Sequence, residues 1–185
     1  DKRSGRTGTG IWLHGTPSET FSRPPEDSNG CVIMSNDDLN TLAPYIREGQ
    51  TTPVILAQKI DWISKTGWQQ RRKNFYSHLE EWRKDWESRD VGLYLRHYSK
   101  DYEGLGKDYE GLVSHKHRVN ASKSFIKVDL INTSIFLYPN GTDPIFVVTF
   151  IQNYSSNNFQ RVYRKRQYWR MEDDGNWRII FEGFV

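Results

Sequence analysis

An aromatic stripe between residues 68 and 88 is the feature that most constrains the fold. Its members follow one another at spacings of four, three and four residues, which places them on one face of an α-helix: Phe75, Leu79, Trp82 and Trp86. Hydrophobic residues make up only 36% of the chain, but 14% of the residues are aromatic, and each ring buries a large area. The sequence therefore predicts a helix over 68–88 whose rings form the core of a domain.

Two shorter helices are predicted after this one. Asp90 is suited to cap the second helix, which is expected to carry Val91, Tyr94, Leu95 and Tyr98. Residues 112–121 are expected to form the third helix. Between them the sequence KDYEGL occurs twice, at 100–105 and 107–112. Two copies do not make a repeat fold, so we interpret the duplication as a loop insertion between helices.

Strand patterns occupy the remainder of the chain, at residues 125–138, 145–151, 162–171 and 177–181. The first is expected to bulge near 132–134, where its alternation slips. The second is expected to be the central strand because it is apolar on both faces. Helices followed by long antiparallel strands predict an α+β fold, in which three helices pack against a curved sheet to form a cone. We assign residues 68–185 to this domain and residues 65–67 to a linker.

Residues 1–64 carry fewer elements. Short buried strands are predicted at 11–13, 32–34 and 53–57. Ser35 and Asp38 have the spacing of a capping box, which predicts a helix from this point to near Gly49. Three short strands and one helix are marginal for an independent core. We therefore interpret residues 1–64 as the C-terminal part of a larger domain.

The chain has a single cysteine, Cys31, and a histidine, His14, at the end of a short apolar run. A thiolate is a nucleophile and an imidazole can generate it, so these residues are a candidate catalytic pair. Gly30 allows close backbone approach, so that main-chain N–H groups can face a developing oxyanion. The alternative is a buried structural cysteine, because free cysteine is among the most buried residue types.

Two sequence segments around this pair resemble known motifs. Residues 14–17 (HGTP) and 28–32 (SNGCV) resemble motifs of the YkuD-like L,D-transpeptidases, bacterial cysteine enzymes that act on the peptide stems of peptidoglycan. This resemblance covers residues 5–64. The predicted order of helices and strands after residue 67 resembles the NTF2-like fold. The chain from residue 5 to its end is thus similar to Csd6-type L,D-transpeptidases, in which an NTF2-like domain follows the catalytic domain.

The resemblance implies a mechanism. Cys31 as thiolate attacks the carbonyl of a diamino acid that precedes D-alanine, and His14 is the base. The Gly15 carbonyl orients the imidazole, and the amides of Gly30 and Cys31 form the oxyanion hole. An amine acceptor gives a cross-link, the L,D-transpeptidase reaction, whereas water gives a trimmed tripeptide, the L,D-carboxypeptidase reaction. The sequence leaves both open, and it implies no metal or cofactor.

Substrate contacts are expected from the loop before the cysteine. Ser28 and Asn29 are expected to touch the substrate and Arg23 to meet its carboxylate, although Ser28 and Arg23 are equally suited to hold the loop itself. Many relatives carry a histidine where this chain has Asn29. Asparagine forms hydrogen bonds but does not titrate, so the role of base rests on His14 alone.

A second function class stays open beside the enzyme. The chain is alternatively an NTF2-like module that binds a small ligand or glycan in its cone, with a degenerate or truncated, inactive catalytic part. A dimer is also left open. The net charge of +3 is too small to predict nucleic acid as a partner. The family implies a periplasmic or cell-envelope location, with an export signal in a part of the protein that precedes residue 1.

Overall fold

The computed structural model describes residues 12–17, 30–46, 54–56, 62–138 and 143–185. The chain divides into two compact units, Asp1–Val54 and Ile55–Val185. None of the described helices is long and apolar enough to cross a membrane.

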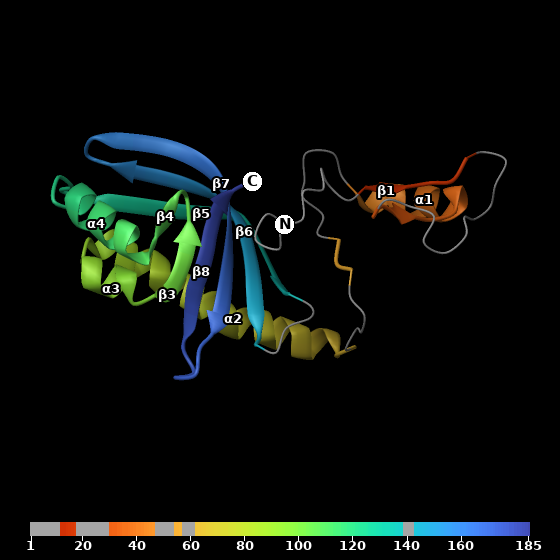
Figure 1. Cartoon of the computed structure of the whole chain (residues 1–185), viewed down its shortest axis with the longest axis horizontal. Helices are drawn as coiled ribbons and strands as arrows, with labels where there is room; N and C mark the ends of the chain where they lie inside the picture. Colours follow the sequence, from red (N-terminus) through yellow and green to blue (C-terminus); the bar gives the residue numbers. More distant parts are fainter. Residues whose placement is uncertain (1–11, 18–29, 47–53, 57–61, 139–142) are drawn as a thin grey trace. The chain divides into compact units, whose positions relative to one another are not determined.

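The second unit begins with the long helix α2, Lys65–Ser88 (Figure 1). Ser64 is its N-cap, and the Ser64 hydroxyl accepts a hydrogen bond from the Gly67 N–H at 3.0 Å. Residues 65–67, expected as a linker, are therefore the first turn of this helix, because Ser64 satisfies one of the N–H groups that a helix start leaves unpaired.

This cap gives a testable prediction. Ser64→Ala is expected to lower the free energy of unfolding of the second unit by about 1 kcal/mol, because the Gly67 N–H loses its acceptor. Urea unfolding followed by tryptophan fluorescence measures the change. Ser77→Ala is the control, since Ser77 lies inside α2 and only donates back to the Asn74 carbonyl. Equal losses in both variants would contradict the capping role.

Two short helices follow, and each has the expected kind of cap. Helix α3, Val91–Leu95, starts after Asp90, which accepts a hydrogen bond from the Leu93 N–H. Helix α4, Tyr109–Asn120, starts after Asp108, which accepts one from the Gly111 N–H. Both predicted helices are present, although α3 ends at Leu95, before Tyr98, which instead begins a strand, and α4 begins three residues earlier than expected.

The duplicated KDYEGL segments do not form a loop insertion. The first copy lies in strand β3, Tyr98–Gly104, and the second starts as strand β4, Lys107–Asp108, which pairs antiparallel with β3. Leu105 and Gly106 both have positive φ, at 51° and 73°, as a tight two-residue hairpin turn requires. In the second copy, Asp108 caps helix α4, whereas the matching aspartate of the first copy caps no helix. The two copies therefore differ in structure.

Four long strands complete the sheet: β5, Ile126–Leu137; β6, Ile145–Ser156; β7, Phe159–Met171; and β8, Trp177–Phe184. The strand order is β4-β3-β8-β7-β6-β5, and the α+β class is confirmed. All neighbours pair antiparallel except β3 and β8, which are parallel. The predicted bulge in β5 is confirmed by a register shift between Ile131 and Ser134. Strand β6 is an interior strand between β5 and β7, but it is not in the middle of the sheet.

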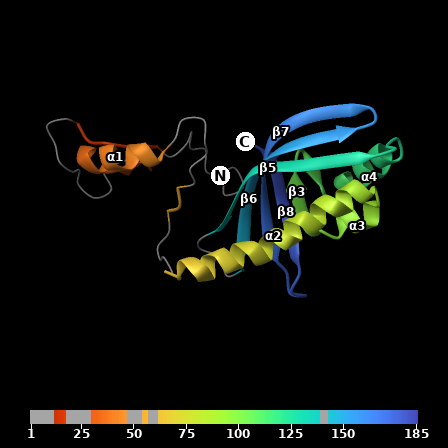
Figure 2. The ribbon, with the colours of Figure 1, turned by 180° about the vertical axis from the view of Figure 1, so that it is seen from behind.

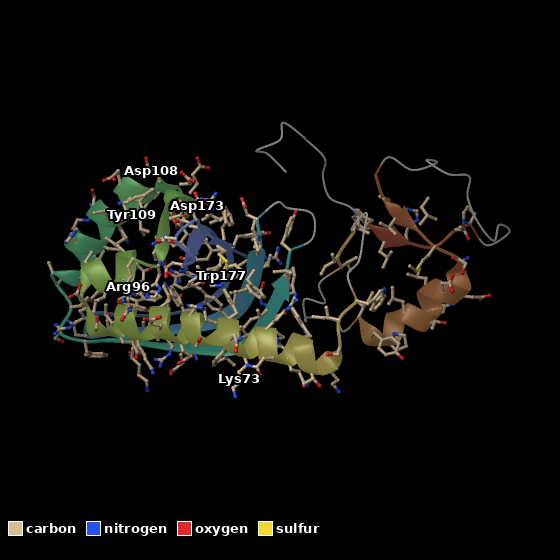
Figure 3. The ribbon with its side chains drawn as sticks, turned by 90° about the horizontal axis from the view of Figure 1, so that it is seen from below. Lys73, Arg96, Asp108, Tyr109, Asp173 and Trp177 are labelled. Atoms are coloured by element: carbon tan, nitrogen blue, oxygen red, sulfur yellow. The ribbon has the colours of Figure 1, made fainter. Side chains whose placement is uncertain are left out.

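The aromatic stripe of α2 faces this curved sheet (Figure 2). Phe75 lies 4.2 Å from the Phe146 ring, and Trp82 lies 6.0 Å from the Phe150 ring. Lys73, which is off the stripe, is exposed and points away from the core (Figure 3). The predicted helical stripe therefore forms the core of the second unit.

The first unit has a two-stranded parallel ladder, β1, Leu13–His14, and β2, Val32–Ile33. Helix α1, Asn36–Leu42, follows, and the Ser35 hydroxyl accepts a hydrogen bond from the Asp38 N–H at 3.1 Å, which confirms the predicted cap. The helix ends earlier than the expected Gly49. It tightens into a 3₁₀ turn at Ala43–Tyr45, where Pro44 has no N–H to continue the α-helix.

The prediction of a strand at 53–57 is wrong for residues 54–56, the part of this range that the structure describes. Residues 54–56 have no regular structure, and the side chains of Val54, Ile55 and Leu56 are 59%, 43% and 52% exposed. A strand is stabilised by a hydrogen-bonded neighbour, and no described residue pairs with this segment. Positions 53 and 57, like position 11 of the first predicted strand, lie outside the described residues.

Candidate functional site

The first candidate site lies on the β1–β2 ladder. Leu13 pairs with Val32 and His14 with Ile33, held by hydrogen bonds from the Val32 N–H to the Trp12 carbonyl and from the Met34 N–H to the His14 carbonyl. His14 follows Leu13 and Cys31 precedes Val32. His14 therefore lies within β1, and Cys31 directly precedes β2 at the neighbouring strand.

The imidazole of His14 has a defined hydrogen bond. Its Nδ1 atom lies 2.8 Å from the Gly15 carbonyl oxygen, which can only accept, so Nδ1 carries the hydrogen and donates it. In a neutral imidazole, Nε2 is then the basic nitrogen. His14 is exposed and Cys31 is partly buried. The predicted contact between Gly15 and the imidazole is therefore present, with Nε2 left as the proton acceptor.

Two glycines shape the surroundings of this pair. Gly30 has φ of 99°, a conformation that favours glycine, and nothing would touch a side chain there. At Gly15, in contrast, a Cβ atom would lie 2.0 Å from Oδ1 of Asn36, at the start of α1. The backbone conformation at Gly30 thus favours glycine, whereas a larger residue at Gly15 would require the Asn36 side chain to move. Arg23, Ser28 and Asn29 lie outside the described residues.

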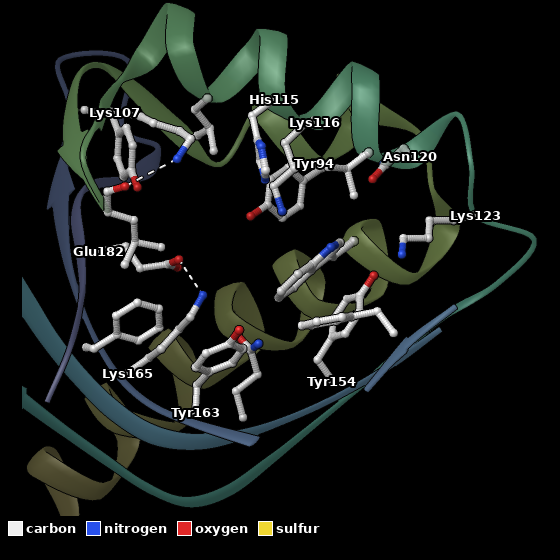
Figure 4. A pocket seen from close by; sticks show the side chains of 18 of the residues that line it. Tyr94, Lys107, His115, Lys116, Asn120, Lys123, Tyr154, Tyr163, Lys165 and Glu182 are labelled. Atoms are coloured by element: carbon white, nitrogen blue, oxygen red, sulfur yellow. Dashed lines mark hydrogen bonds and ion pairs between the residues drawn. The ribbon is translucent and has the colours of Figure 1, made fainter. Parts of the chain in front are cut away.

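A second candidate site is a pocket inside the second unit, with a volume of about 540 Å³ (Figure 4). Its wall is largely aromatic and includes Trp86, Tyr94, Tyr154, Phe159 and Tyr163. Its described lining also holds four lysines against a single carboxylate, that of Glu182: Lys107, Lys116, Lys123 and Lys165. The pocket therefore combines an aromatic wall with an excess of positively charged side chains.

One lysine is already neutralised by the carboxylate. Nζ of Lys165 lies 2.7 Å from Oε1 of Glu182, and the two side chains are 7% and 5% exposed. Gln167 donates a hydrogen bond to the other carboxylate oxygen at 2.6 Å. Burial alone would raise the pKa of Glu182, but Lys165 and Gln167 outweigh it and lower that pKa. Glu182 and Lys165 therefore form a charged, hydrogen-bonded pair in the wall.

Lys116 is placed differently. Its Nζ lies 4.3 Å from the centre of the Trp86 ring and 4.2 Å from that of Tyr94, and no described carboxylate lies within ion-pair distance. Burial, together with the nearby charge of Lys165, lowers the pKa of Lys116 to about 7. Aromatic faces attract a cation, but they do not cancel its charge.

The comparisons with known proteins match both units. Residues 1–56 match the family model of the L,D-transpeptidase catalytic domain, and residues 74–183 match that of the Cds6 C-terminal NTF2-like domain, which is more than half of the chain. This chain belongs to the Cds6 NTF2-like domain family. The predicted order of an L,D-transpeptidase-type domain and an NTF2-like domain is thereby confirmed.

Solved structures agree with this Cds6-type organisation. Bd1075 of Bdellovibrio bacteriovorus is 31% identical, with a TM-score of 0.81 over 100% of this chain and 64% of that one. Pgp2 of Campylobacter jejuni, a helical cell shape determining protein, is 23% identical, with a TM-score of 0.77 over 98% of this chain and 63% of that one. The Cds6-type chain thus spans less than two thirds of either protein. No curated protein sequence matches it significantly.

The NTF2-like part also matches a stand-alone domain. An NTF2-like protein of unknown function from Pseudomonas putida KT2440 is 13% identical, with a TM-score of 0.52 over 63% of this chain and 87% of that one. At this identity the likeness concerns the fold alone.

In the Cds6-type chain, some residues that line the pocket were not predicted from the sequence, Lys116 and Lys165 among them. A signal for Lys165 existed, because it alternates with the buried residues Gln167 and Trp169 along β7.

Proposed function

We propose that the protein is a peptidoglycan L,D-transpeptidase or L,D-carboxypeptidase with Cys31 as its nucleophile. The observation that carries this proposal is the pairing of β1, which contains His14, with β2, which Cys31 directly precedes, together with the His14 ring held by the Gly15 carbonyl. The match of residues 1–56 to the catalytic domain supports the reaction class. The family supports a periplasmic or cell-envelope location, with peptidoglycan stem peptides as the substrate.

In the proposed reaction, Nε2 of His14 takes the thiol proton and the Cys31 thiolate attacks the carbonyl carbon of the diamino acid. A carbon–sulfur bond forms, and the amides of Gly30 and Cys31 stabilise the resulting oxyanion. The carbon–nitrogen bond then breaks, and His14 gives its proton to the departing D-alanine. An amine or a water molecule finally attacks the thioester and releases Cys31. Arg23, Ser28 and Asn29 stay predicted substrate contacts.

The test uses the natural full-length protein with purified muropeptides. Tetrapeptide stems are expected to lose D-alanine, to yield tripeptides with water or cross-linked products with an amine. The product profile decides between the two reactions. Incubation with a carbapenem should leave a covalent adduct on Cys31, because a β-lactam carbonyl is attacked by the same nucleophile. A protein that yields neither product nor adduct would overturn the assignment.

A second candidate function is favoured by the pocket of the NTF2-like domain. A cavity of about 540 Å³ with an aromatic wall has the size and composition of a small-molecule or glycan site. In this reading the domain binds a cell-wall fragment, and the Cys31 unit is inactive. Trimming of tetrapeptide stems by the natural protein would reject the inactive-enzyme form of this reading, but it would leave the binding role of the pocket in place.

A further inference from the structure

A buried histidine outside both candidate sites, His97, lies between the end of α3 and the start of β3. Its side chain is 7% exposed, and its Nε2 atom lies 2.7 Å from Oδ2 of Asp85 on α2, whose side chain is 13% exposed. An ionised carboxylate only accepts hydrogen bonds, so Nε2 carries a hydrogen and donates it. In the neutral ring, the second nitrogen, Nδ1, then carries no hydrogen.

The main chain of His97 ties the same residue to the sheet. Its carbonyl accepts a hydrogen bond from the Ile179 N–H of β8 at 2.7 Å, next to the pairing of Tyr98 with Ile179 in the parallel β3–β8 ladder. The centre of its ring lies 6.3 Å from that of Trp169 on β7. His97 therefore contacts α2 through its side chain and β8 through its main chain, at the point where β3 joins the sheet.

Three charged groups face the ring: Asp85 and Glu81 of α2, and Arg96, its neighbour in the chain. Nε of Arg96 donates to Asp85 at 3.0 Å, and Nη2 of Arg96 donates to Glu81 at 2.6 Å. The contacts from β7 and β8, an indole ring and a main-chain N–H, carry no charge. The Asp85 carboxylate therefore has a cationic partner even when the imidazole is neutral.

A second proton on the His97 ring would go to Nδ1. No described residue offers an acceptor to an N–H at that nitrogen, and burial removes most of its access to water. Burial is accordingly the largest influence on the pKa of His97 and lowers it, while the hydrogen bond to Asp85 raises it by less. Because the unfolded chain then binds the proton more readily, stability is complete above the ordinary histidine pKa of 6.5 and is lost as the pH falls below it.

We propose that His97 and Asp85 form an acid-sensitive latch, which holds the β3 edge of the sheet against α2 at neutral pH and releases it in a mildly acidic medium. When His97 takes a proton from the solvent on Nδ1, its buried position becomes unfavourable. Strand β3 then loosens from β8 together with β4, which joins the described sheet through β3. The His97–Asp85 latch depends neither on catalysis by Cys31 nor on a ligand in the pocket.

The first measurement compares the whole wild-type chain with His97→Gln, which keeps an N–H for Asp85 but does not titrate. Urea unfolding followed by tryptophan fluorescence gives the unfolding constant of the second unit from about pH 8 to about pH 5. The ratio of the wild-type constant to that of His97→Gln is expected to rise by at least about threefold on acidification, since one unit of pKa lowering corresponds to a factor of ten. His117→Gln, at an exposed position of α4, is the control and should keep the full acid loss.

The second measurement locates the release by native-state hydrogen exchange. Amide protection in Tyr98–Gly104, corrected for the intrinsic exchange rate at each pH, is expected to fall on acidification by more than that of residues 146–150 in the interior strand β6. In His97→Gln the two segments should change alike. Asp85→Asn should lose more protection in β3 over the same pH range than the wild-type chain, because the carboxylate that opposes the effect of burial is gone.

Melting curves identify a variant that fails to fold, and proton NMR of the His97 ring in the wild-type chain then gives its pKa directly, with a value below 6.5 expected. Titration of the ring at or above that value overturns the proposal. Equal acid loss in the wild-type chain and His97→Gln, or equal loss of protection in β3 and β6, overturns it as well. A loss centred on β3 that disappears in His97→Gln supports it. The muropeptide assay of Cys31 is decided separately from all of these outcomes.

Discussion

Cys31→Ala in the natural protein is expected to reduce the release of D-alanine from tetrapeptide stems by at least about 10³-fold, because no acyl-enzyme can form without the nucleophile. Liquid chromatography of the muropeptides measures the rate. His14→Ala is expected to cause a comparable loss, since Nε2 of His14 is the proposed proton acceptor and donor. Effects of groups that act as a unit are not additive, so the double variant should lose little more than either single one.

The control for this pair lies on the adjacent helix. Asn40 is exposed on α1, and Asn40→Ala is expected to keep full activity. Full activity in His14→Ala would show that another group acts as the base. Activity retained in Cys31→Ala would remove the covalent mechanism altogether, and with it the carbapenem adduct.

Glu182→Leu is expected to lower the free energy of unfolding of the second unit by about 3–5 kcal/mol. The substitution leaves the buried ammonium of Lys165 without its partner at 2.7 Å, and it removes the acceptor of Gln167. The cost of an unpaired buried charge exceeds the net worth of the pair that it came from. Urea unfolding, with fluorescence and circular dichroism as two probes, measures the change.

A double variant tests the reason for this loss. Lys165→Met combined with Glu182→Leu removes both charges and is expected to be more stable than Glu182→Leu alone by about 2 kcal/mol or more. It should not recover fully, because Gln167 still lacks an acceptor. Glu81→Gln is the surface control. Glu81 contacts Arg96 with both side chains about half exposed, so a change below about 1 kcal/mol is expected. A double variant as unstable as the single one would contradict the unpaired-charge explanation.

Local patterns predicted the parts of the fold that depend on local spacing. The stripe from Phe75 to Trp86 predicted the core because a helix repeats every 3.6 residues, whatever packs against it. The helix caps at Ser35 and Asp90 and the bulge of β5 were likewise predicted from residues that are close together in the sequence. Residues 65–67 were misassigned because their short polar sequence looks like a linker, while the capping serine directly before them was overlooked.

Features that depend on distant residues could not be predicted in this way. The parallel pairing of β3 with β8 joins two segments that are far apart in the sequence, so neither segment alone predicts it. At the first site, the motifs gave His14, Gly15 and Cys31, and the structure added the hydrogen bond from the His14 ring to the Gly15 carbonyl. At the second site, Lys116 follows the buried Leu112 by four residues, which places it on the inner face of α4. Only the folded domain shows that Lys116 forms no ion pair with a carboxylate of the described residues.

The position of β8 between β3 and β7 has a consequence for how the domain folds. Strands β5 to β8 join by successive short connections and can zip together as hairpins soon after collapse. Strand β3 must instead find β8 across the whole intervening chain, which requires closure of a long loop before any contact is gained. We expect strands β5 to β8 to pair early and the β3–β4 edge, with α4 and the part of the pocket wall that α4 supplies, to dock last. Native-state hydrogen exchange should accordingly open that edge first, so the α4 side of the pocket belongs to the least stable cooperative part of the domain.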